Sequence, residues 1–373
     1  MKIGITGQAG FVGTHLFNHL SISKHNHELI RFEDDYFYDA NQLRNFVQQC
    51  DSIVHLAALN RHNNPDEIYS KNIELVEKLI QALKETGSKA HVVFSSSVQE
   101  ERDNLYGQSK KEGRLKLADW ASKNNSGFTG LVIPNVFGPF GRPFYNSALS
   151  TFSYQVVKGE QPKIEIDAEL NLIYVSELVS EIEKVLLETH GKLNDYKLVP
   201  HSFSNKVSSI MKKIVGFGDQ YLKNGIIPKL ENRNEINLFN TFRSYIDPKT
   251  FFPFKYTSHH DARGNFVEVL RTEIGGQVSF STTKPNVTRG NHFHTRKIER
   301  FAVIKGEALI QLRKIGTSEI IDLKLSGKEP SFVDMPVWFT HNIKNIGDDE
   351  LYTNFWINEF FDPNDPDTYF ENV

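Results

Sequence analysis

A glycine-rich turn near the N-terminus most strongly limits what this chain can fold into. Residues 2–6 form a short apolar run, and the following TGQAGFVG places Gly7, Gly10 and Gly13 three residues apart ahead of an amphipathic segment. Glycines between a strand and a helix permit a tight turn and let the backbone approach a diphosphate at the helix N-terminus. The context favours a dinucleotide-binding unit, with a purely structural loop as the alternative.

Short apolar runs alternate with helical patterns along the next part of the chain. Residues 29–32, 52–56, 91–94 and 131–133 are apolar runs of strand length. Between two of these runs, the apolar side chains of residues 72–84 recur with helical spacing on one face. This alternation predicts an α/β Rossmann-type doubly wound parallel sheet.

The later part of the chain has a different pattern. After about residue 245, short alternating runs are separated by turn signals, which predicts an all-β jelly-roll barrel. The runs are residues 266–270, 277–280, 301–304, 308–312, 320–323 and 353–357. A chain of 373 residues is about twice the usual domain size. We therefore expect two domains, residues 1–245 and 246–373, with a helical connection that begins near residue 200.

Composition and charge exclude several classes of partner. The net charge of −3 gives no electrostatic basis for binding nucleic acid or an anionic membrane. No apolar run approaches the length of a bilayer span, and no signal-peptide core is evident. With Cys50 as the one cysteine, the sequence offers no intramolecular disulfide. We expect a cytoplasmic protein with no nucleic-acid and no membrane partner.

A tyrosine and a lysine form the first candidate catalytic pair. In YGQSK, a helix would place Tyr106 and Lys110 on one face. A lysine cation lowers the pKa of a neighbouring phenol, which can then exchange a proton with a carbonyl or an alcohol. Upstream, FSSS ends a predicted strand at the carboxyl edge of the sheet, where Ser96 or Ser97 would reach the same oxygen. Taken alone, Y-x-x-x-K is also common on solvated helices.

Residues 1 to about 245 resemble the extended short-chain dehydrogenases/reductases that act on nucleotide sugars. TGQAGFVG, HLAA, the KNIELVEKL helix, FSSS, YGQSK and PNVFGP carry the resemblance. It implies that Tyr106 is the acid/base, that Lys110 positions the nicotinamide ribose, and that Ser97 or Ser96 polarises the reacting oxygen. Asn135 would lie near the sugar nucleotide. The implied cofactor-binding residues are Gly7, Gly10, Phe11, Val12, Gly13, Leu56, Ala57, Ala58, Asn72, Tyr106 and Lys110.

Two features leave details of this site open. The serine run lies only about ten residues before Tyr106, where relatives have a much longer loop, so the cover over the sugar is shortened and the acting serine is undecided. Glu33 suits the ribose 2′-hydroxyl of NAD, whereas Arg31 suits the 2′-phosphate of NADP. The residue types alone do not choose between these cofactors.

Polar residues in the later part of the chain have the spacing of a metal site. RGNHFHTRKIER contains His292, His294 and Glu299, and MPVWFTHNIKN adds His341. Two histidines at alternate positions of a strand point to the same side, and a carboxylate with a further histidine would complete a cage. Such ligands suit zinc, iron, nickel or manganese. The alternative is a set of ordinary polar residues in a barrel mouth.

This segment resembles the cupin family and, within it, the dTDP-4-keto-sugar 3,5-epimerases. The narrower resemblance rests on DARGNFVE and TRGNHFH. It implies that Arg263 and Arg289 hold the nucleotide diphosphate, with Glu268 in the same substrate site. His292 would be the base, and Lys297 would stabilise the enolate oxygen. Those epimerases use no metal, so His292 as a free base and His292 as a ligand remain two alternatives.

The whole chain resembles a family of bifunctional bacterial enzymes of capsular-polysaccharide synthesis. The resemblance implies C3 epimerisation in the cupin and then NADPH-dependent reduction of the C4 ketone in the N-terminal domain. The implied substrate is UDP-2-acetamido-2,6-dideoxy-hexos-4-ulose, and the product is UDP-N-acetyl-6-deoxy-L-talosamine, the precursor of UDP-N-acetyl-L-fucosamine for capsule or O-antigen. A zinc ion in the cupin and a homodimer or higher homo-oligomer are also implied.

Two alternatives belong to other functional classes. In the first, only the reductase is catalytic and the cupin is a metal-stabilised binding and dimerisation module. In the second, the chain is a non-catalytic scaffold or regulator that senses a nucleotide sugar. The intact pair of Tyr106 and Lys110 argues against the second alternative.

Overall fold

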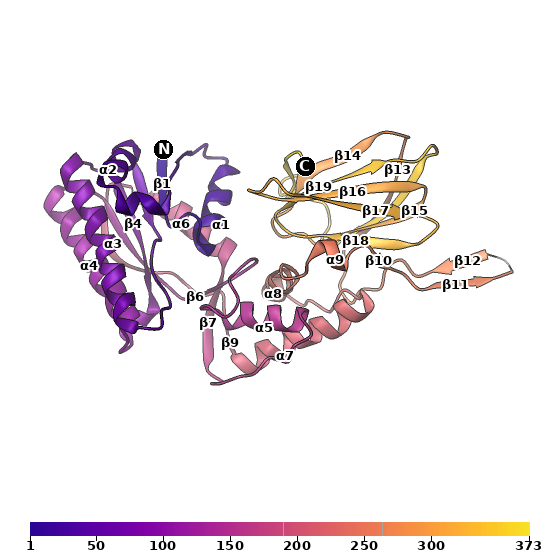
Figure 1. The fold of residues 1–373 in the computed structure, drawn as a ribbon, viewed down its shortest axis with the longest axis horizontal. Coiled ribbons are helices and arrows are strands. Elements are labelled where there is room, and N and C mark those ends of the chain that lie inside the picture. Colours follow the sequence, from indigo (N-terminus) through magenta and orange to yellow (C-terminus); the bar gives the residue numbers. More distant parts are fainter. Residues whose placement is uncertain (189, 263) are drawn as a thin grey trace. The chain divides into compact units, whose positions relative to one another are not determined.

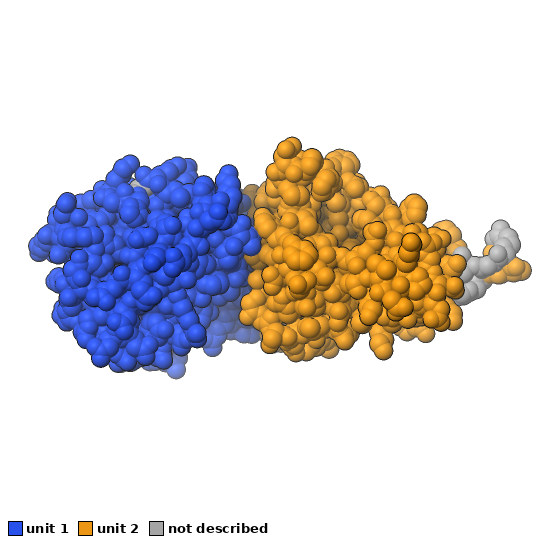
Figure 2. Space-filling view, turned by 90° about the horizontal axis from the view of Figure 1, so that it is seen from above, with its two compact units in different colours: residues 1–148, 166–207 blue, residues 149–165, 208–373 orange. Residues whose placement is uncertain are grey.

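The chain divides into two compact units. The computed structural model describes residues 1–188, 190–262 and 264–373. By contacts, one unit comprises residues 1–148 and 166–207, and the other comprises residues 149–165 and 208–373 (Figure 2). This division by contacts differs from the expected boundary after residue 245. The expected boundary separates the two activities, and that separation stays a prediction.

A six-stranded parallel sheet forms the centre of the first unit. Its order is β2-β1-β3-β4-β5-β8, so the chain reverses direction across the sheet between β1 and β3. Such a reversal is where open α/β sheets bind ligands, at the carboxyl ends of the strands. The strands are β1 (Lys2–Thr6), β2 (Glu28–Ile30), β3 (Ser52–His55), β4 (His91–Ser97), β5 (Phe128–Ile133) and β8 (Leu193–Leu198).

Helices cover both faces of this sheet, each over its own hydrophobic core. Phe46, Leu79 and Trp120 belong to one core, whereas Leu16 and Ile182 belong to the other. The first core is covered by α2 (Ala40–Gln49), α3 (Pro65–Thr86) and α4 (Leu105–Asn124), and the second by α1 (Phe11–Ser21) and α6 (Val175–Glu188) (Figure 1). Two helical layers around a parallel sheet confirm the predicted doubly wound fold.

Short elements complete the first unit. The 3-10 turns η1 (Asp34–Tyr38) and η2 (Val98–Glu101) follow β2 and β4. A separate three-stranded sheet has the order β6-β7-β9. Its strands are β6 (Asn135–Phe137), β7 (Glu169–Tyr174) and β9 (Phe203–Lys206).

The second unit combines helices with an all-β domain, which confirms the predicted change of fold class. Its helical elements are most of α5 (Ala148–Val157), α7 (Val207–Phe217), the π-helical turn η3 (Gly218–Leu222), α8 (Arg233–Arg243) and α9 (Pro248–Phe251). One five-stranded sheet contains β10 (Phe254–Lys255), β18 (Ser331–Met335), β15 (Glu299–Lys305), β20 (Leu351–Ile357) and β13 (Gln277–Thr283), in that order. The other contains β17 (Ile320–Ser326), β16 (Glu307–Lys314), β19 (Phe339–Asn345), β14 (Thr288–Phe293) and β21 (Tyr369–Phe370).

Some strand predictions need correction. The apolar run at residues 266–270 overlaps only the end of β12 (Gly264–Val267), which pairs with β11 (Ser258–Asp261) in a hairpin that projects from the sheets (Figure 1). β18 and β19 were not among the expected runs, although β19 carries His341. His294 follows the end of β14 instead of lying within it, so strand alternation alone does not explain its direction.

A buried ion pair within the all-β domain also bonds the helical segment. Arg300 Nε lies 2.7 Å from Asp334 Oδ1, and Arg300 Nη2 lies 2.9 Å from Asp334 Oδ2. The Tyr221 hydroxyl donates to Asp334 Oδ2 at 2.6 Å, and Arg300 Nη1 donates to the Gly225 carbonyl at 2.9 Å. These contacts explain why residues 208–245 group with the second unit.

Among the described residues, no helix is long and apolar enough to cross a membrane.

Candidate active site and metal centre

The glycine turn joins β1 to α1 at the carboxyl edge of the sheet. Gly7 has a φ of +70°, and a Cβ atom there would lie 2.8 Å from the Ala57 amide nitrogen. Gly10 is the N-cap of α1 and donates its amide to the Gly7 carbonyl at 3.0 Å. The amides of Phe11, Val12 and Gly13 open the helix without a side-chain cap, so they suit a diphosphate there.

The loop after β3 lies against the end of β1. The Leu56 amide donates to the Thr6 carbonyl at 3.2 Å, and the Ala57 amide donates to Thr6 Oγ1 at 3.4 Å. Leu56, Ala57 and the following Ala58 therefore lie beside the glycine turn at the reversal point of the sheet. This is the place expected for three of the predicted cofactor-binding residues.

The two residues that suggested different cofactors contact each other. Arg31 and Glu33 follow β2 and form an ion pair through Arg31 Nη2 and Glu33 Oε1. Their side chains are 81% and 43% exposed, so either group is accessible to a ribose or a phosphate. In this pairing Glu33 partly neutralises the cation that a 2′-phosphate requires.

Tyr106 and Lys110 lie one turn apart in α4. Lys110 Nζ donates to the Ser95 carbonyl at 2.8 Å and lies 5.8 Å from the centroid of the Tyr106 ring. Burial lowers the pKa of Lys110 to about 8, although Glu100 acts in the opposite direction. Burial and then the charge of Tyr145 raise the pKa of Tyr106. The expectation of a lowered tyrosine pKa is wrong for the free protein, because burial dominates.

The two candidate serines have different partners. The Ser96 hydroxyl donates to the Glu100 carboxylate, which is buried and pairs with Arg114 at 2.8 Å. Ser97 Oγ instead accepts the Gln99 amide at 3.2 Å. The Ser97 hydroxyl proton is therefore not consumed by that bond, and it can be offered to a ligand. The geometry favours Ser97 over Ser96 as a ligand-binding group.

Asn72 holds the predicted site together from within α3. Its Oδ1 accepts the Leu59 amide at 2.7 Å, and its Nδ2 donates to the Leu59 carbonyl at 3.1 Å and to Ser109 Oγ at 3.0 Å. Both amide hydrogens are thus used within the protein. Asn72 joins the loop after β3 to the residue before Lys110, which is a positioning arrangement.

Tyr145 borders this site, because its charge acts on Tyr106. The Tyr145 hydroxyl accepts the Asn60 amide at 3.3 Å, and Arg61 Nη1 donates to the Tyr145 carbonyl at 3.2 Å. Sequence reasoning missed Tyr145, because the GRPFYN loop carries no motif and its link to Asn60 is non-local. Asn135, the predicted sugar contact, begins β6 and donates its Nδ2 to the Asn171 carbonyl at 3.2 Å.

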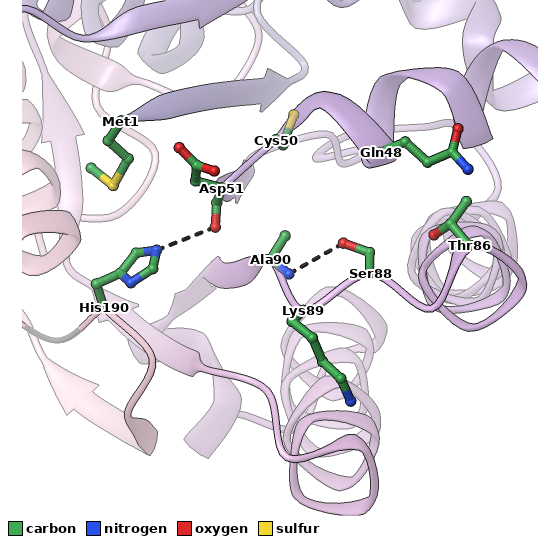
Figure 3. Close-up of a pocket in the computed structure, with 9 residues that line it drawn as sticks. All are labelled: Met1, Gln48, Cys50, Asp51, Thr86, Ser88, Lys89, Ala90 and His190. Atoms are coloured by element: carbon green, nitrogen blue, oxygen red, sulfur yellow. Dashed lines mark hydrogen bonds between the residues drawn. The ribbon is translucent and has the colours of Figure 1, made fainter.

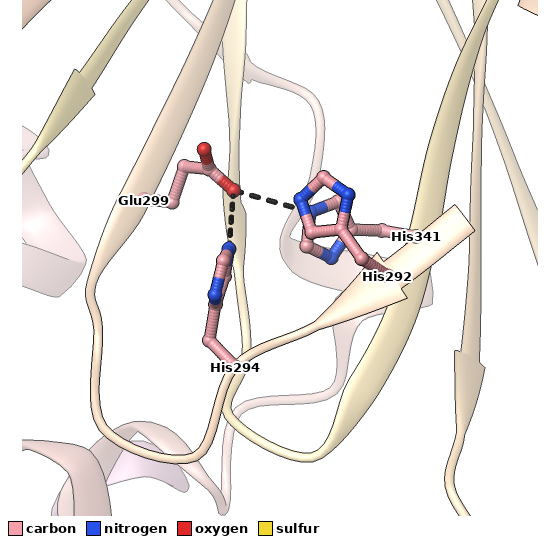
Figure 4. A group of neighbouring side chains, drawn as sticks. All are labelled: His292, His294, Glu299 and His341. Carbon is pink, nitrogen blue, oxygen red and sulfur yellow. Dashed lines mark hydrogen bonds and ion pairs between the residues drawn. The ribbon is translucent and has the colours of Figure 1, made fainter. Parts of the chain in front are cut away.

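The structure brings together all four predicted metal ligands in the second unit. His292, His294, Glu299 and His341 each offer a ligand atom, and these atoms lie within 4.8 Å of one another (Figure 4). Glu299 Oε2 lies 3.1 Å from His294 Nε2 and 3.1 Å from His341 Nε2. His294, Glu299 and His341 are buried and His292 is half-buried. This composition and spacing suit a divalent transition metal.

Backbone carbonyls hold the outer nitrogens of two of these histidines. His294 Nδ1 lies 2.5 Å from the Asp367 carbonyl, and His341 Nδ1 lies 3.2 Å from the Phe339 carbonyl. A carbonyl only accepts, so each Nδ1 donates its hydrogen and each Nε2 faces Glu299. In a neutral ring that Nε2 carries a lone pair, whereas a protonated His294 donates from Nε2 to Glu299. Buried His341 Nε2 has no hydrogen-bond partner among the described residues. Facing acceptors of this kind fit a cation, so the residues suit the implied metal.

Burial, hydrogen bonds and neighbouring charges shift the pKa values of three members of this group. Burial lowers the pKa of His292 to about 4. Burial acts in the same direction on His294, but the hydrogen bond and charge of Glu299 outweigh it and raise the pKa of His294. Burial opposes ionisation of Glu299, but its histidine neighbours hold the pKa of that carboxyl well below its usual range.

The residues predicted for an epimerase substrate are not brought together by any contact of the described chain. Lys297 is buried, donates its Nζ to the Pro366 carbonyl at 2.5 Å and lies 3.9 Å from Glu359. Arg289 is an exposed residue of β14. Glu268 pairs with Arg271 at 2.8 Å just after the β11–β12 hairpin. Arg263 lies outside the described residues.

A surface pocket of about 580 Å³ lies at the amino-terminal edge of the parallel sheet (Figure 3). Met1, Asp51 and Ala90 line it at the amino ends of β1, β3 and β4, together with Cys50 and His190. Ligands of open α/β sheets bind at the opposite, carboxyl ends. Burial raises the pKa of the Cys50 thiol to about 12, so this pocket offers no reactive nucleophile.

Comparison with known proteins assigns the family. Residues 3–197 match the NAD dependent epimerase/dehydratase family, and residues 259–369 match the polysaccharide biosynthesis C-terminal domain. The capsular polysaccharide assembling protein CapF from Staphylococcus aureus is 34% identical, covers 100% of both chains and has a TM-score of 0.64. The chain belongs to the CapF family.

Other similarities agree with membership in the CapF family. A UDP-2-acetamido-2,6-beta-L-arabino-hexul-4-ose reductase from Pseudomonas aeruginosa is 33% identical over 372 residues, 99% of this chain and 98% of the relative. A UDP-N-acetylglucosamine 4-epimerase from Bacillus cereus is 19% identical over 59% of this chain and 82% of its own, with a TM-score of 0.50, which supports the fold alone. The full-length CapF match confirms the resemblance inferred from the sequence.

Proposed function

We propose that this CapF-family chain is a bifunctional nucleotide-sugar enzyme. It epimerises C3 of UDP-2-acetamido-2,6-dideoxy-hexos-4-ulose and then reduces C4 with NADPH, giving UDP-N-acetyl-6-deoxy-L-talosamine on the route to UDP-N-acetyl-L-fucosamine. One observation carries the proposal. A chain 33% identical to a UDP-hexul-4-ose reductase contains both a Tyr106–Lys110 pair and a separate His–Glu metal group. We assign reduction to residues 1–245 and epimerisation to residues 246–373.

In the reduction, Tyr106 is the proposed proton donor. Its raised pKa keeps the phenol protonated at neutral pH, which is the state that can protonate the oxygen formed at C4. The Ser97 hydroxyl orients that oxygen, and the Lys110 cation stabilises the phenolate left behind. Bound NADPH supplies the hydride. The Arg31 guanidinium holds the 2′-phosphate of NADPH after its ion pair with Glu33 has opened. Asn135 contacts the sugar nucleotide.

In the epimerisation, the barrel removes and returns the hydrogen at C3. The C4 ketone makes that hydrogen acidic, and reduction would end the acidity, so epimerisation comes first. The proposed ligands His292, His294, Glu299 and His341 hold zinc, which when bound supplies Lewis-acid or structural stabilisation. Lys297 is the proposed cation for the enolate oxygen. Arg263, Glu268 and Arg289 are the proposed substrate contacts.

His292 has a second candidate role as the base. It is half-buried, whereas the other three members of the group are buried, so it is the member most accessible to a substrate. A three-ligand site with one open position is common among catalytic zinc centres. Zinc content of a His292→Gln variant separates the roles. Retained zinc with lost C3 exchange supports the base, and lost zinc supports the ligand.

Two single substitutions test the division of activities. Tyr106→Phe should slow reduction by about 10²- to 10⁴-fold and leave C3 exchange intact, whereas Glu299→Gln should abolish C3 exchange and leave reduction of an already epimerised ketone intact. Tyr38→Phe is the matched control, because Tyr38 is 73% exposed. Full reduction by Tyr106→Phe would contradict the reductase assignment. Full exchange by Glu299→Gln would contradict the epimerase assignment.

A binding and dimerisation role for the barrel is the second candidate function. β13 is an edge strand, and its Val278 and Phe280 side chains are 58% and 75% exposed, which suits contact with a second copy. We propose a homodimer or higher homo-oligomer, to be checked by light scattering. If the barrel served only for binding, no C3 exchange would occur and Glu299→Gln would leave the whole turnover unchanged.

A further inference from the structure

The C-terminal segment from Glu359 to Glu371 is fastened to the loop that carries His294 and Lys297. Arg296 pairs with Glu359 at 3.0 Å and with Asp365 at 2.9 Å. β21 adds to this by pairing with β14, where Phe370 lies opposite His292. The segment therefore contacts both histidines of the H-x-H motif, although it lies about seventy residues away in the sequence.

Asp367 is the centre of this attachment. Its side chain is buried, with 2% of the residue exposed, and its carboxylate accepts four hydrogen bonds. Oδ1 accepts the Thr295 amide at 3.0 Å and the Thr295 hydroxyl at 2.6 Å, and Oδ2 accepts the amides of Arg296 and Lys297 at 3.0 Å each. Three successive amides around one carboxylate form an anion-binding nest. The proposed reduction and epimerisation steps assign no role to the Asp367 carboxylate.

The same residue contacts the proposed metal ligand through its backbone. Asp367 adopts a φ of +41°, and its carbonyl lies 2.5 Å from His294 Nδ1. That bond directs His294 Nε2 toward Glu299, 3.1 Å away. The carbonyl stays in place only while the carboxylate of the same residue is held, because a left-handed backbone at a non-glycine residue is otherwise unfavourable.

We propose that Asp367 is a positioning residue of the metal centre, which sets the tautomer and direction of His294 through its anchored carbonyl. The proposal rests on the metal site of the proposed function. It assigns the C-terminal segment a role in metal affinity beyond closing the fold. Outer-sphere partners of metal-bound histidines change metal affinity by about 10- to 100-fold when they are substituted.

The test measures zinc affinity of the full-length chain by competition with a chromophoric chelator. Asp367→Asn keeps the size of the side chain but replaces one acceptor oxygen with an NH₂ group that faces the amides of Arg296 and Lys297. We expect the zinc Kd to rise about 10- to 100-fold. Asp365→Asn is the matched control in the same segment, because the Asp365 side chain is 69% exposed and, among the described residues, pairs with Arg296 alone. Its Kd should stay within about twofold of the wild type.

A second readout separates positioning from a merely structural role. A positioning role predicts that the zinc-induced rise in melting temperature shrinks in Asp367→Asn, whereas a structural role lowers the metal-free and zinc-bound melting temperatures equally. If Asp367→Asn does not fold, Thr295→Val removes one of the four bonds and should raise the zinc Kd several-fold. An unchanged Kd in the folded variant would overturn the proposal. A wild-type chain that binds no zinc would instead overturn the metal site on which the proposal rests.

Discussion

His294 Nε2 and Glu299 Oε2 lie 3.1 Å apart, and the other ring nitrogen of His294, Nδ1, is hydrogen-bonded to the backbone carbonyl of Asp367. A ring held in this way directs Nε2 at the carboxylate, and a zinc ion can take the place of the proton that otherwise links these two groups. We therefore expect zinc to stabilise the all-β unit. Zinc at about 100 times its Kd should add about 2.7 kcal/mol to the free energy of unfolding.

Calorimetry with zinc, with magnesium and with a chelator checks this prediction. Only zinc should raise the melting temperature, and Glu299→Gln should remove the rise, because it takes away the anionic ligand. Equal melting temperatures in all three conditions would show that the four side chains are ordinary polar residues of the barrel.

The ion pair between Arg31 and Glu33 predicts the cofactor preference of variants. Arg31→Met should weaken NADPH binding by about tenfold or more, since a charge-assisted contact contributes about 1.5–3 kcal/mol, and it should leave NADH binding nearly unchanged. Glu33→Gln is the matched control, because it removes the partner that competes for Arg31. Fluorescence titration with both cofactors gives the ratio. Weakened NADH binding by Glu33→Gln, with NADPH unaffected by Arg31→Met, would assign the enzyme to NADH.

The lowered pKa of Lys110 predicts an alkaline limit for the reductase. With a pKa of about 8, the ammonium group is largely charged at pH 7 and loses its charge as the pH rises above 8. Tyr106 has a raised pKa, so it stays protonated and adds no second limit in this range. The kcat/KM for NADPH, which reports the free enzyme, should fall above about pH 8. Lys110→Arg keeps the charge and should show a flat profile at lower amplitude. A wild-type profile that stays level to pH 9.5 would contradict the assignment.

The ion pair between Arg300 and Asp334 predicts a large effect on stability. Their side chains are 3% and 0% exposed, so Asp334→Asn leaves a buried guanidinium without its counter-charge. Loss of one partner of a buried pair costs about 3–5 kcal/mol. Glu329→Gln breaks the exposed pair with Lys255, whose side chains are 73% and 75% exposed, and should cost less than about 1 kcal/mol. Urea unfolding followed by tryptophan fluorescence measures both. Similar values for the two variants would show that the buried pair is not essential.

Local patterns allowed much of the molecule to be predicted from its sequence. The turn at Gly7, the helix that carries Tyr106 and Lys110, and the spacing of His292, His294 and Glu299 each depend on residues within a few positions of one another. The fold class followed from the same kind of pattern, because the period of apolar residues changes near residue 245.

The features that could not be predicted depend on contacts between distant residues. Tyr145 reaches the reductase site through the Asn60 amide, 85 residues away, and Asp367 reaches His294 across 73 residues. The pKa of Tyr106 was predicted in the wrong direction because burial, which a local motif does not encode, dominates it. The β19 strand was missed because polar residues, among them the proposed ligand His341, interrupt its apolar positions.

Proton NMR in D₂O with the UDP-4-keto-6-deoxy-N-acetylhexosamine ketone tests the central claim most directly. Wild-type enzyme is incubated with the ketone first without NADPH and then with it, and Glu299→Gln serves as the control. The account predicts that deuterium enters C3 before any NADPH is added, that reduction of C4 follows its addition, and that Glu299→Gln shows no exchange. Reduction without any exchange at C3 would contradict it, and the barrel would then be a binding module of a single-activity reductase.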